Sequence, residues 1–248
     1  MLDFKGKKAL VTGGSRGIGA STVRELASRG AAVVFTWSRN EAQAQALEKD
    51  LQAQGRTVFA LKADQGSEAD SAQAVRKAAE RLGGLDILVN NAGVFLGGVI
   101  GDAGRDAEVQ QRQWSVNLHG VAASVHAALA YLPRGGRIIN VGSVLAQRSL
   151  FPGLADYSAT KAALEGYTRG WAKDLGAKGI TVNIVHPGPI DTEMNPAEGD
   201  LSSAQKGLTS LGRFGKPEEV AAAIVFLASP AASYITGASL KVDGGIAL

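Results

Sequence analysis

The 248-residue chain contains no cysteine, and only 6% of its residues are aromatic. Without thiols the protein has no disulfides, no thiolate metal ligands and no cysteine nucleophile. This composition is typical of a reducing compartment, so we expect a cytoplasmic protein. With few aromatic rings available, the core must consist mostly of alanine, valine, leucine and isoleucine side chains.

Long uninterrupted apolar runs and a strong charge of one sign are also missing. The N-terminus has no apolar stretch of the kind that signal peptides carry. The uncharged run 220–240 contains Pro230 and Gly237, which predict a helix, a loop and a strand rather than a membrane span. The net charge is only +3 and both signs are mixed along the chain. We therefore predict no membrane and no nucleic-acid partner.

The three histidines give no metal-binding pattern. His119 and His126 share a predicted helix, whereas His186 lies far away along the chain. Because no H-E-x-x-H motif or acidic cluster accompanies them, we predict no metal site and expect histidines at the core or at an interface. Asp191 and Glu193 are expected in a solvated loop.

Segments typical of strands and helices alternate along the chain, which predicts one α/β domain over residues 1–248 with a parallel sheet covered by helices on both faces. The predicted strands are 9–12, 32–36, 57–61, 87–89, 137–141, 181–185 and 239–242. The predicted helices end near Arg29 or span 41–54, 68–82, 108–131 and 157–177, and a further one begins at Pro217. Residues 187–212 show weak periodicity and several loop-forming residues.

A glycine cluster, T-G-G-S-R-G-I-G at residues 12–19, follows the first predicted strand. Glycines allow a tight turn and a close backbone approach to a pyrophosphate, and the next helix offers free N–H groups and the positive end of its dipole. The spacing G-x-x-x-G-x-G differs from the commoner G-x-G-x-x-G. A turn that merely bends is the alternative, but the position between strand and helix favours dinucleotide binding.

Later segments complete a recognisable set. Asn90-Asn91-Ala92-Gly93 follows the fourth strand, and Asn117, Ser143, Tyr157-x-x-x-Lys161 and Pro187-Gly188 come in order after it. Over almost its whole length the chain resembles the short-chain dehydrogenase/reductase family. The resemblance implies a doubly wound Rossmann fold with a seven-stranded parallel sheet, a nicotinamide cofactor and a homotetramer. We expect a dinucleotide-binding half at about 1–93 and a catalytic and substrate half at about 94–248.

Tyr157 and Lys161 lie on one face of a predicted helix because four residues separate them. A positive charge at about 5 Å, with an effective dielectric of about 20, lowers a tyrosine pKa by roughly two units, to about 8 or below. We predict that Tyr157 donates a proton in reduction and accepts one in oxidation. The alternative is an amphipathic helix with both residues at its rim.

The resemblance also implies roles for individual residues. Ser143 orients the substrate oxygen, Lys161 also holds the nicotinamide ribose, and Asn117 helps to hold a water that passes protons from Tyr157 through Lys161 to solvent. The implied cofactor contacts are Gly13, Ser15, Arg16, Gly17, Ile18, Gly19, Ser38, Arg39, Asp64 and Gln65 (adenine), Asn91, Ala92 and Gly93 (adenosine ribose), Tyr157, Lys161, Pro187, Gly188, and Ile190 and Thr192 (nicotinamide amide).

The residues after the second strand predict the choice of dinucleotide. An acidic residue there binds the ribose diol and repels a 2′-phosphate. Here Trp37 occupies that position and Ser38-Arg39 follow. Arg39 offers a fork of donors to a phosphate, and Arg16 in the glycine-rich turn is placed to join it. We therefore predict NADP(H), although Arg39 also fits a solvated helix start.

Residues 191–212 are predicted to form a mobile lid over the substrate, because glycines and Asn195-Pro196 interrupt them. The apolar residues in the lid (Met194, Leu201, Leu208 and Leu211) favour a small-molecule ketone. Two alternatives stay open. One is a 3-oxoacyl-[acyl-carrier-protein] reductase, with Arg169, Lys173 and Lys178 as part of a basic patch. The other is an NADP(H)-sensing binding protein.

Alanines recur on the two longest predicted helices, 108–131 and 157–177. Small side chains on a helix face permit close helix packing. These faces therefore favour a homo-oligomer, in agreement with the tetramer that the resemblance implies.

Overall fold

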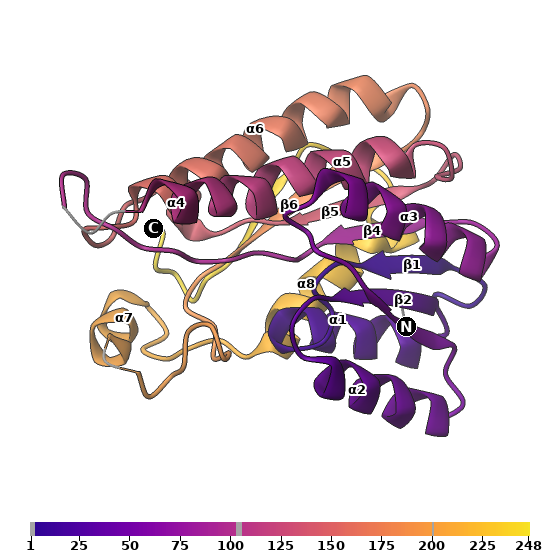
Figure 1. Cartoon of the computed structure of the whole chain (residues 1–248), viewed down its shortest axis with the longest axis horizontal. Helices are drawn as coiled ribbons and strands as arrows, with labels where there is room; N and C mark the ends of the chain where they lie inside the picture. The colour runs from indigo at the N-terminus through magenta and orange to yellow at the C-terminus, as the bar shows by residue number, and fades with distance from the viewer. Residues whose placement is uncertain (1–2, 103–105, 200) are drawn as a thin grey trace.

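The computed structural model describes residues 3–102, 106–199 and 201–248. Seven parallel strands form one sheet in the order β3-β2-β1-β4-β5-β6-β7 (Figure 1). The strands are β1 Lys8–Val11, β2 Ala32–Trp37, β3 Val58–Lys62, β4 Ile87–Asn90, β5 Arg137–Val141, β6 Thr181–Pro187 and β7 Ser239–Val242. The predicted doubly wound, seven-stranded Rossmann fold is confirmed.

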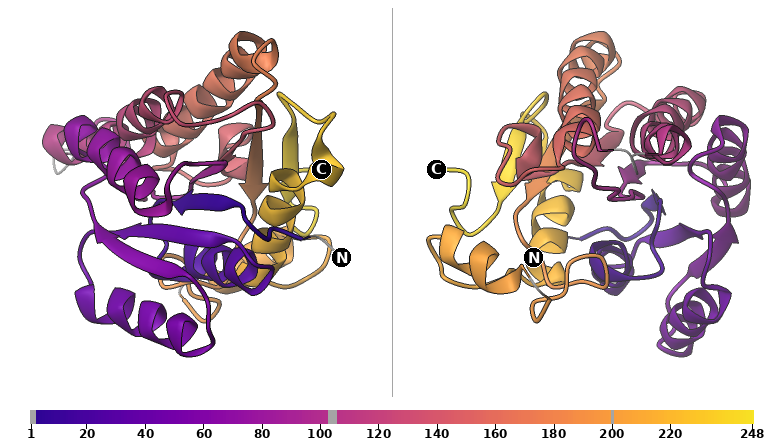
Figure 2. Two further views of the ribbon diagram at one scale, coloured as in Figure 1. Left: turned by 90° about the vertical axis from the view of Figure 1, so that its right-hand side faces the viewer. Right: turned by 60° about the vertical axis from the view of Figure 1, so that its left-hand side comes forward.

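Helices cover both faces of this sheet, as the two views of Figure 2 show. One layer consists of α1 (Gly17–Ser28), α2 (Glu41–Ala53) and α8 (Pro217–Ala228). The other consists of α3 (Glu68–Leu82), α4 (Ala107–Trp114), α5 (Gly120–Ala128) and α6 (Ala155–Gly176). Alternate side chains of each strand face opposite layers: Ala9 and Val11 pack into one core, and Leu10 packs into the other. This two-sided burial explains why the strands read as continuous apolar runs.

Two helix boundaries follow directly from local sequence. The Ser67 hydroxyl accepts the Asp70 N–H at 3.2 Å and caps α3, which ends at Gly83 in the left-handed conformation (φ +70°). Pro217 occupies the first turn of α8, where its missing N–H costs nothing. Glu219 reaches back to accept the Lys216 N–H at 2.7 Å.

The prediction of one continuous helix over 108–131 was wrong. Between α4 and α5 lies one turn of π-helix, η1 (Ser115–His119), and α5 ends at Ala128. The wide turn brings Gly120 against the Gln65 carbonyl, where a Cβ would lie only 1.8 Å from the oxygen. Residues 107–128 contain no proline, so no helix-breaking residue marked this single π-turn in the sequence.

The predicted irregular segment 187–212 contains one short helix, α7 (Ser202–Leu208). None of its residues is buried, and Leu208 is 45% exposed. Without a buried face, the helix has no apolar period that sequence analysis could detect.

The chain topology places a crevice between β1 and β4. From β1 the connections run outward to β2 and β3, and from β4 they run the other way toward β7. Ligands of open parallel sheets bind at such a switch point, beyond the carboxyl ends of the strands. Across the described ranges, no helix is both long and apolar enough to traverse a lipid bilayer.

Candidate active site

A cavity of about 960 Å³ lies beyond the carboxyl ends of the central strands. Every residue predicted to contact the cofactor lines it, from Gly13 in the turn after β1 to Thr192 after β6. Of the predicted catalytic residues, Ser143, Tyr157 and Lys161 line it too, whereas Asn117 lies behind its wall. Segments from both halves of the chain therefore meet around one space.

The glycine-rich turn fits against the β4 segment with almost no space between them. Gly13 (φ +63°) has the left-handed conformation that favours glycine. A Cβ on Gly19 would lie 2.3 Å from the Gly13 oxygen, so only glycine fits there. Asn91 Nδ2 fastens the turn by donating to the Thr12 and Gly13 oxygens, each at 2.9 Å. The glycines thus leave backbone exposed to a ligand.

Helix α1 begins at this turn without a side-chain cap: its N-cap residue, Arg16, accepts no N–H with its side chain. Gly17 and Ile18, the first helical residues, line the cavity. Uncapped N–H groups and the positive end of the helix dipole suit an anion such as a pyrophosphate. Together with the glycine cradle, this end of the cavity fits a dinucleotide.

The predicted 2′-phosphate site lies at the end of β2. Trp37 is buried, and the Lys62 ammonium lies 5.5 Å from the centre of its ring. Ser38 and Arg39 follow on the cavity wall, and the Arg39 side chain is exposed. This end of the cavity is therefore basic and open.

Arg16 already has a partner in the segment that is predicted to form the lid. Its Nη1 lies 2.6 Å from Glu193 Oε2, and Gln43 Nε2 donates to Glu193 Oε1 at 2.9 Å. Hydrogen bonds from Gln43 and then Arg16 lower the pKa of Glu193. Glu193 does lie in a solvated loop, as expected, but it bridges the lid to both walls of the cavity.

Asp64, the predicted adenine contact, is held by the protein itself. Arg112 binds both of its carboxylate oxygens, and the Gly66 N–H donates to Oδ1 at 2.9 Å. The Arg112 hydrogen bond lowers the pKa of Asp64, although burial opposes it. Beside it, Gln65 Nε2 is buried without a hydrogen-bond partner among the described residues. Gln65 lines the cavity, but this buried nitrogen lies against Gly120 rather than facing the open space.

Ser143, Tyr157 and Lys161 meet at the inner end of the cavity. Tyr157 and Lys161 share one face of α6, and Tyr157 forms a side-chain hydrogen bond with Ser143. The Lys161 ammonium is buried, donates to the Val141 oxygen at 2.9 Å and lies 5.7 Å from the centre of the Tyr157 ring. A Cβ on Gly93 would make ordinary van der Waals contact with Asn117 Oδ1 and Lys161 Nζ, at 3.4 and 3.5 Å, so Gly93 lies beside both groups.

The predicted lowering of the Tyr157 pKa by Lys161 was wrong for the protein alone. Burial raises the pKa of Tyr157 to about 12, although the Ser143 hydrogen bond lowers it in part. Burial also lowers the pKa of Lys161 to about 8. Removing both groups from water disfavours their charged forms, and this cost exceeds the attraction assumed from spacing alone. At neutral pH Tyr157 is therefore a protonated hydroxyl.

Asn117 supports the site from behind. In the π-turn its side chain is fully buried, and it holds Val94 from both sides: Oδ1 accepts the Val94 N–H and Nδ2 donates to the Val94 oxygen, each at 2.9 Å. Nδ2 also donates to Thr160 Oγ1 at 3.2 Å. Both amide hydrogens are thus used inside the protein.

Several lining residues were missed by sequence reasoning. Phe95 packs edge-on against Tyr157 with ring centres 5.1 Å apart, and Leu150–Leu154 and Ile246 close the apolar side of the cavity. Phe151-Pro152-Gly153 lies one residue before the N-cap end of α6, so these loop-forming residues were a usable signal. No sequence signal pointed to Ile246, because only the tertiary fold brings the C-terminal segment to the cavity. Within the described residues, no His, Asp or Glu cluster is arranged for a metal.

A glycine-rich turn at the switch point of a doubly wound parallel sheet defines a dinucleotide-binding Rossmann fold. Residues 13–247 match the protein family described as Enoyl-(Acyl carrier protein) reductase. The chain is 44% identical, over 97% of both chains, to a cyclic-di-GMP-binding biofilm dispersal mediator protein of Escherichia coli, and 40% identical, over 99% of both, to the 3-oxoacyl-[acyl-carrier-protein] reductase FabG of Vibrio cholerae. A blue fluorescent protein from a metagenomic library, crystallised with NADPH, has 48% identity and a TM-score of 0.96 over 99% of this chain and 100% of its own.

The chain therefore belongs to the short-chain dehydrogenase/reductase family, as its motifs predicted.

Proposed function

We propose that this protein is an NADP(H)-dependent oxidoreductase that reduces the carbonyl group of a small, uncharged ketone. One observation carries the proposal: Ser143, Tyr157 and Lys161 converge at the inner end of a cavity that continues past the glycine-rich turn. A hydroxyl donor, an oxygen-binding hydroxyl and a buried ammonium are the groups that carbonyl reduction requires.

The cofactor assignment is supported by chemistry at the end of β2 and by similarity. Trp37 offers no carboxylate to a ribose diol, whereas Arg39 and Arg16 offer guanidinium groups to a 2′-phosphate. The solved structure with 48% identity holds NADPH. Bound in this cavity, NADPH would supply the hydride that reduces the carbonyl carbon.

The residues of this chain would handle the proton. Tyr157, protonated at neutral pH because burial raises its pKa to about 12, donates its hydroxyl proton to the substrate oxygen. The Ser143 hydroxyl binds the same oxygen as negative charge develops on it. Lys161, with a pKa near 8, is mostly cationic at pH 7 and places a positive charge beside Tyr157. Asn117 keeps Val94 in place. Both Nδ2 hydrogens of Asn117 already have acceptors inside the protein, so the predicted water would have to donate its own hydrogen to an oxygen atom.

The apolar side of the cavity supports an uncharged substrate. Phe95, Val99, Phe151 and Met194 line it together with other apolar residues.

A carrier-protein substrate has less support than a free ketone. Its docking requires a basic surface at the mouth of the cavity. Arg169, Lys173 and Lys178 do not line the cavity. At 1.5 Å per residue, Lys173 lies about 24 Å further along α6 than Tyr157.

Initial rates of NADPH oxidation test the proposal. A panel of aliphatic and aryl ketones would be compared with a carrier-bound 3-oxoacyl thioester, each with NADPH and with NADH. We expect turnover of free ketones with NADPH. Faster turnover of the carrier-bound substrate would establish the carrier-protein reductase instead. Tight NADPH binding with no carbonyl reduced would establish a sensing protein.

We also propose a cytoplasmic homo-oligomer, a tetramer by family resemblance. Its support is the absence of cysteine and the outer surface of α6, where Tyr167 is 42% exposed and stacks on Trp171 with ring centres 4.6 Å apart. Light scattering that gives a monomer mass would exclude the oligomer.

A further inference from the structure

We propose that His186 is a positioning residue for the reaction: its imidazole holds the main chain of Ser143 and thereby aims the Ser143 hydroxyl at Tyr157. The inference rests on the proposed function, because it assigns a support to one of the residues that act on the carbonyl. His186 itself does not line the cavity.

His186 lies in β6, beside the end of β5, and its side chain is 0% exposed. The backbone ladder between these strands ends where the Gly142 N–H donates to the Val185 oxygen at 2.8 Å. At the next residue, Ser143, the chain leaves the sheet and turns into the short 3₁₀-helix η2 (Val144–Ala146). There the imidazole replaces the backbone as the partner of the strand.

The contact to Ser143 is made by one ring atom. His186 Nδ1 lies 3.1 Å from the Ser143 nitrogen and 2.7 Å from the Ser143 oxygen. Burial lowers the pKa of His186, so the ring is neutral at pH 7. A neutral ring with its proton on Nδ1 donates to the oxygen, and one with its proton on Nε2 accepts from the N–H. Either tautomer gives Nδ1 one hydrogen bond to the main chain of Ser143.

The chain is built to admit the ring. A Cβ on Gly142 would lie 2.5 Å from His186 Nδ1 and 2.7 Å from Cε1, which no side chain allows. Glycine at 142 thus lets the imidazole lie directly against the strand end that carries Ser143. This close fit sets the position of Nδ1, not only the filling of the core.

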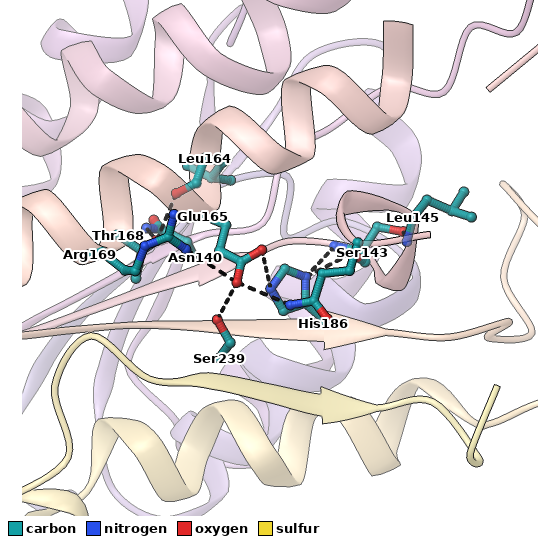
Figure 3. A network of polar contacts seen from close by, with 10 residues as sticks. Asn140, Ser143, Leu145, Leu164, Glu165, Thr168, Arg169, His186 and Ser239 are labelled. Carbon is teal, nitrogen blue, oxygen red and sulfur yellow. Dashed lines mark hydrogen bonds and ion pairs between the residues drawn. The ribbon is translucent and has the colours of Figure 1, made fainter. Parts of the chain in front are cut away.

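The opposite edge of the ring faces a carboxylate (Figure 3). Glu165 Oε2 lies 3.7 Å from His186 Nε2, and Glu165 follows Tyr157 and Lys161 at four-residue intervals on α6. Its other oxygen accepts from Ser239 Oγ at 2.8 Å and from Gln147 Nε2 at 3.1 Å, and Arg169 lies 3.4 Å away. Three partners therefore hold Glu165 beside the ring, and at 3.7 Å its carboxylate is too far to form a hydrogen bond with Nε2.

Because the main chain of Ser143 is held in place, its side chain is held in place too. Ser143 Oγ accepts the Leu145 N–H at 3.1 Å and is hydrogen-bonded to Tyr157. If the Ser143 peptide rotates, its hydroxyl leaves the position that Tyr157 and the substrate oxygen require. Small displacements of positioned groups reduce turnover strongly while leaving cofactor binding intact.

Two amide variants separate positioning from packing. In His186→Asn the amide occupies the place of Nδ1, whereas in His186→Gln it occupies the place of Nε2. We expect kcat of His186→Asn to stay within about threefold of wild type, and kcat of His186→Gln to fall by about tenfold or more. Both variants should keep the NADPH Kd, measured by fluorescence titration, and KM should change less than kcat. Equal kcat values in the two variants, or loss confined to KM, would overturn the proposal.

A double substitution tests whether His186 acts through Ser143. In a Ser143→Ala background the hydroxyl to be positioned is gone, so adding His186→Gln should lower the residual kcat by less than about twofold. A further tenfold loss would show that His186 acts elsewhere and would contradict the proposal. Thermal melting of each variant verifies that it is folded. Wild-type enzyme that binds NADPH but reduces no ketone would refute the proposed function instead.

Discussion

Two parts of the site are built in opposite ways. The site base, defined as Asn117, Ser143, Tyr157 and Lys161, is mostly buried: Asn117 and Lys161 are 0% and 4% exposed, and Tyr157 is half-buried at the cavity wall. The lid contact, defined as Arg16, Gln43 and Glu193, lies at the surface, and the Arg16 and Glu193 side chains are each 52% exposed. Both parts line or support the same cavity.

The difference assigns them different tasks. A buried polar group that loses its partner costs roughly 1–3 kcal/mol, whereas an exposed ion pair contributes about 0–1 kcal/mol. The site base therefore has one arrangement, as a proton-transfer geometry requires. The exposed lid contact costs little to break, and we expect it to open during cofactor exchange.

The largest effect should come from the site base. Tyr157→Phe removes the proton donor and leaves the ring packed against Phe95. We expect kcat to fall by about 10³-fold or more, while the NADPH Kd stays within about twofold. Stopped-flow rates and a fluorescence titration check this, with Tyr131→Phe as a control outside the cavity. Turnover near the wild-type rate would remove Tyr157 from the reaction.

Burial of Lys161 should make stability depend on pH. Because its folded pKa is lowered from 10.5 to about 8, the unfolded chain binds more protons between these values, and stability rises with pH across this window. The gain is on the order of 3 kcal/mol. Tyr157 has the opposite sign: its pKa is raised from 10.0 to about 12, so its contribution is lost as pH rises above 10.

Urea unfolding at pH 7.5 to 10 would measure the Lys161 contribution against Lys161→Met. The wild-type free energy of unfolding should rise relative to the variant over this range. A constant difference would mean that Lys161 is not desolvated as the structure shows.

Arg39→Ala should have a smaller effect, restricted to the phosphate. Losing one exposed guanidinium contact should weaken NADPH binding by about tenfold and leave NADH binding unchanged. Isothermal titration with both cofactors measures this, and Arg76→Ala on α3 is the control. Equal losses for both cofactors would place Arg39 outside the phosphate site.

The smallest effect should come from the lid contact. Glu193→Gln removes the carboxylate that holds Arg16 and frees the guanidinium for the 2′-phosphate. We expect NADPH affinity to rise by no more than about threefold, since the exposed pair contributes little. Asp191→Asn on the same loop is the control. A tenfold change in either direction would show that the lid contact is as strongly held as the site base.

The residues of the site base could be predicted from the sequence, whereas the lid contact could not. The turn requires glycine at positions 13, 17 and 19, and the reaction requires the four-residue spacing of Tyr157 and Lys161. These requirements are local, so they can be recognised in the sequence alone. The Arg16–Glu193 pair joins residues 177 positions apart, and a carboxylate in a loop carries no signal of its partner. The His186–Ser143 contact spans 43 positions. The prediction of the Tyr157 pKa was wrong for a related reason. The sequence spacing shows that a positive charge lies nearby, but only the fold shows how far Tyr157 is removed from water.

The most direct test is a crystal structure of the protein soaked with NADP⁺. We predict the nicotinamide end beside Ser143 and Tyr157, with Lys161 Nζ donating to the adjoining ribose while it keeps its hydrogen bond to the Val141 oxygen. A cofactor bound with its nicotinamide away from these three side chains, or density only outside the cavity, would contradict it.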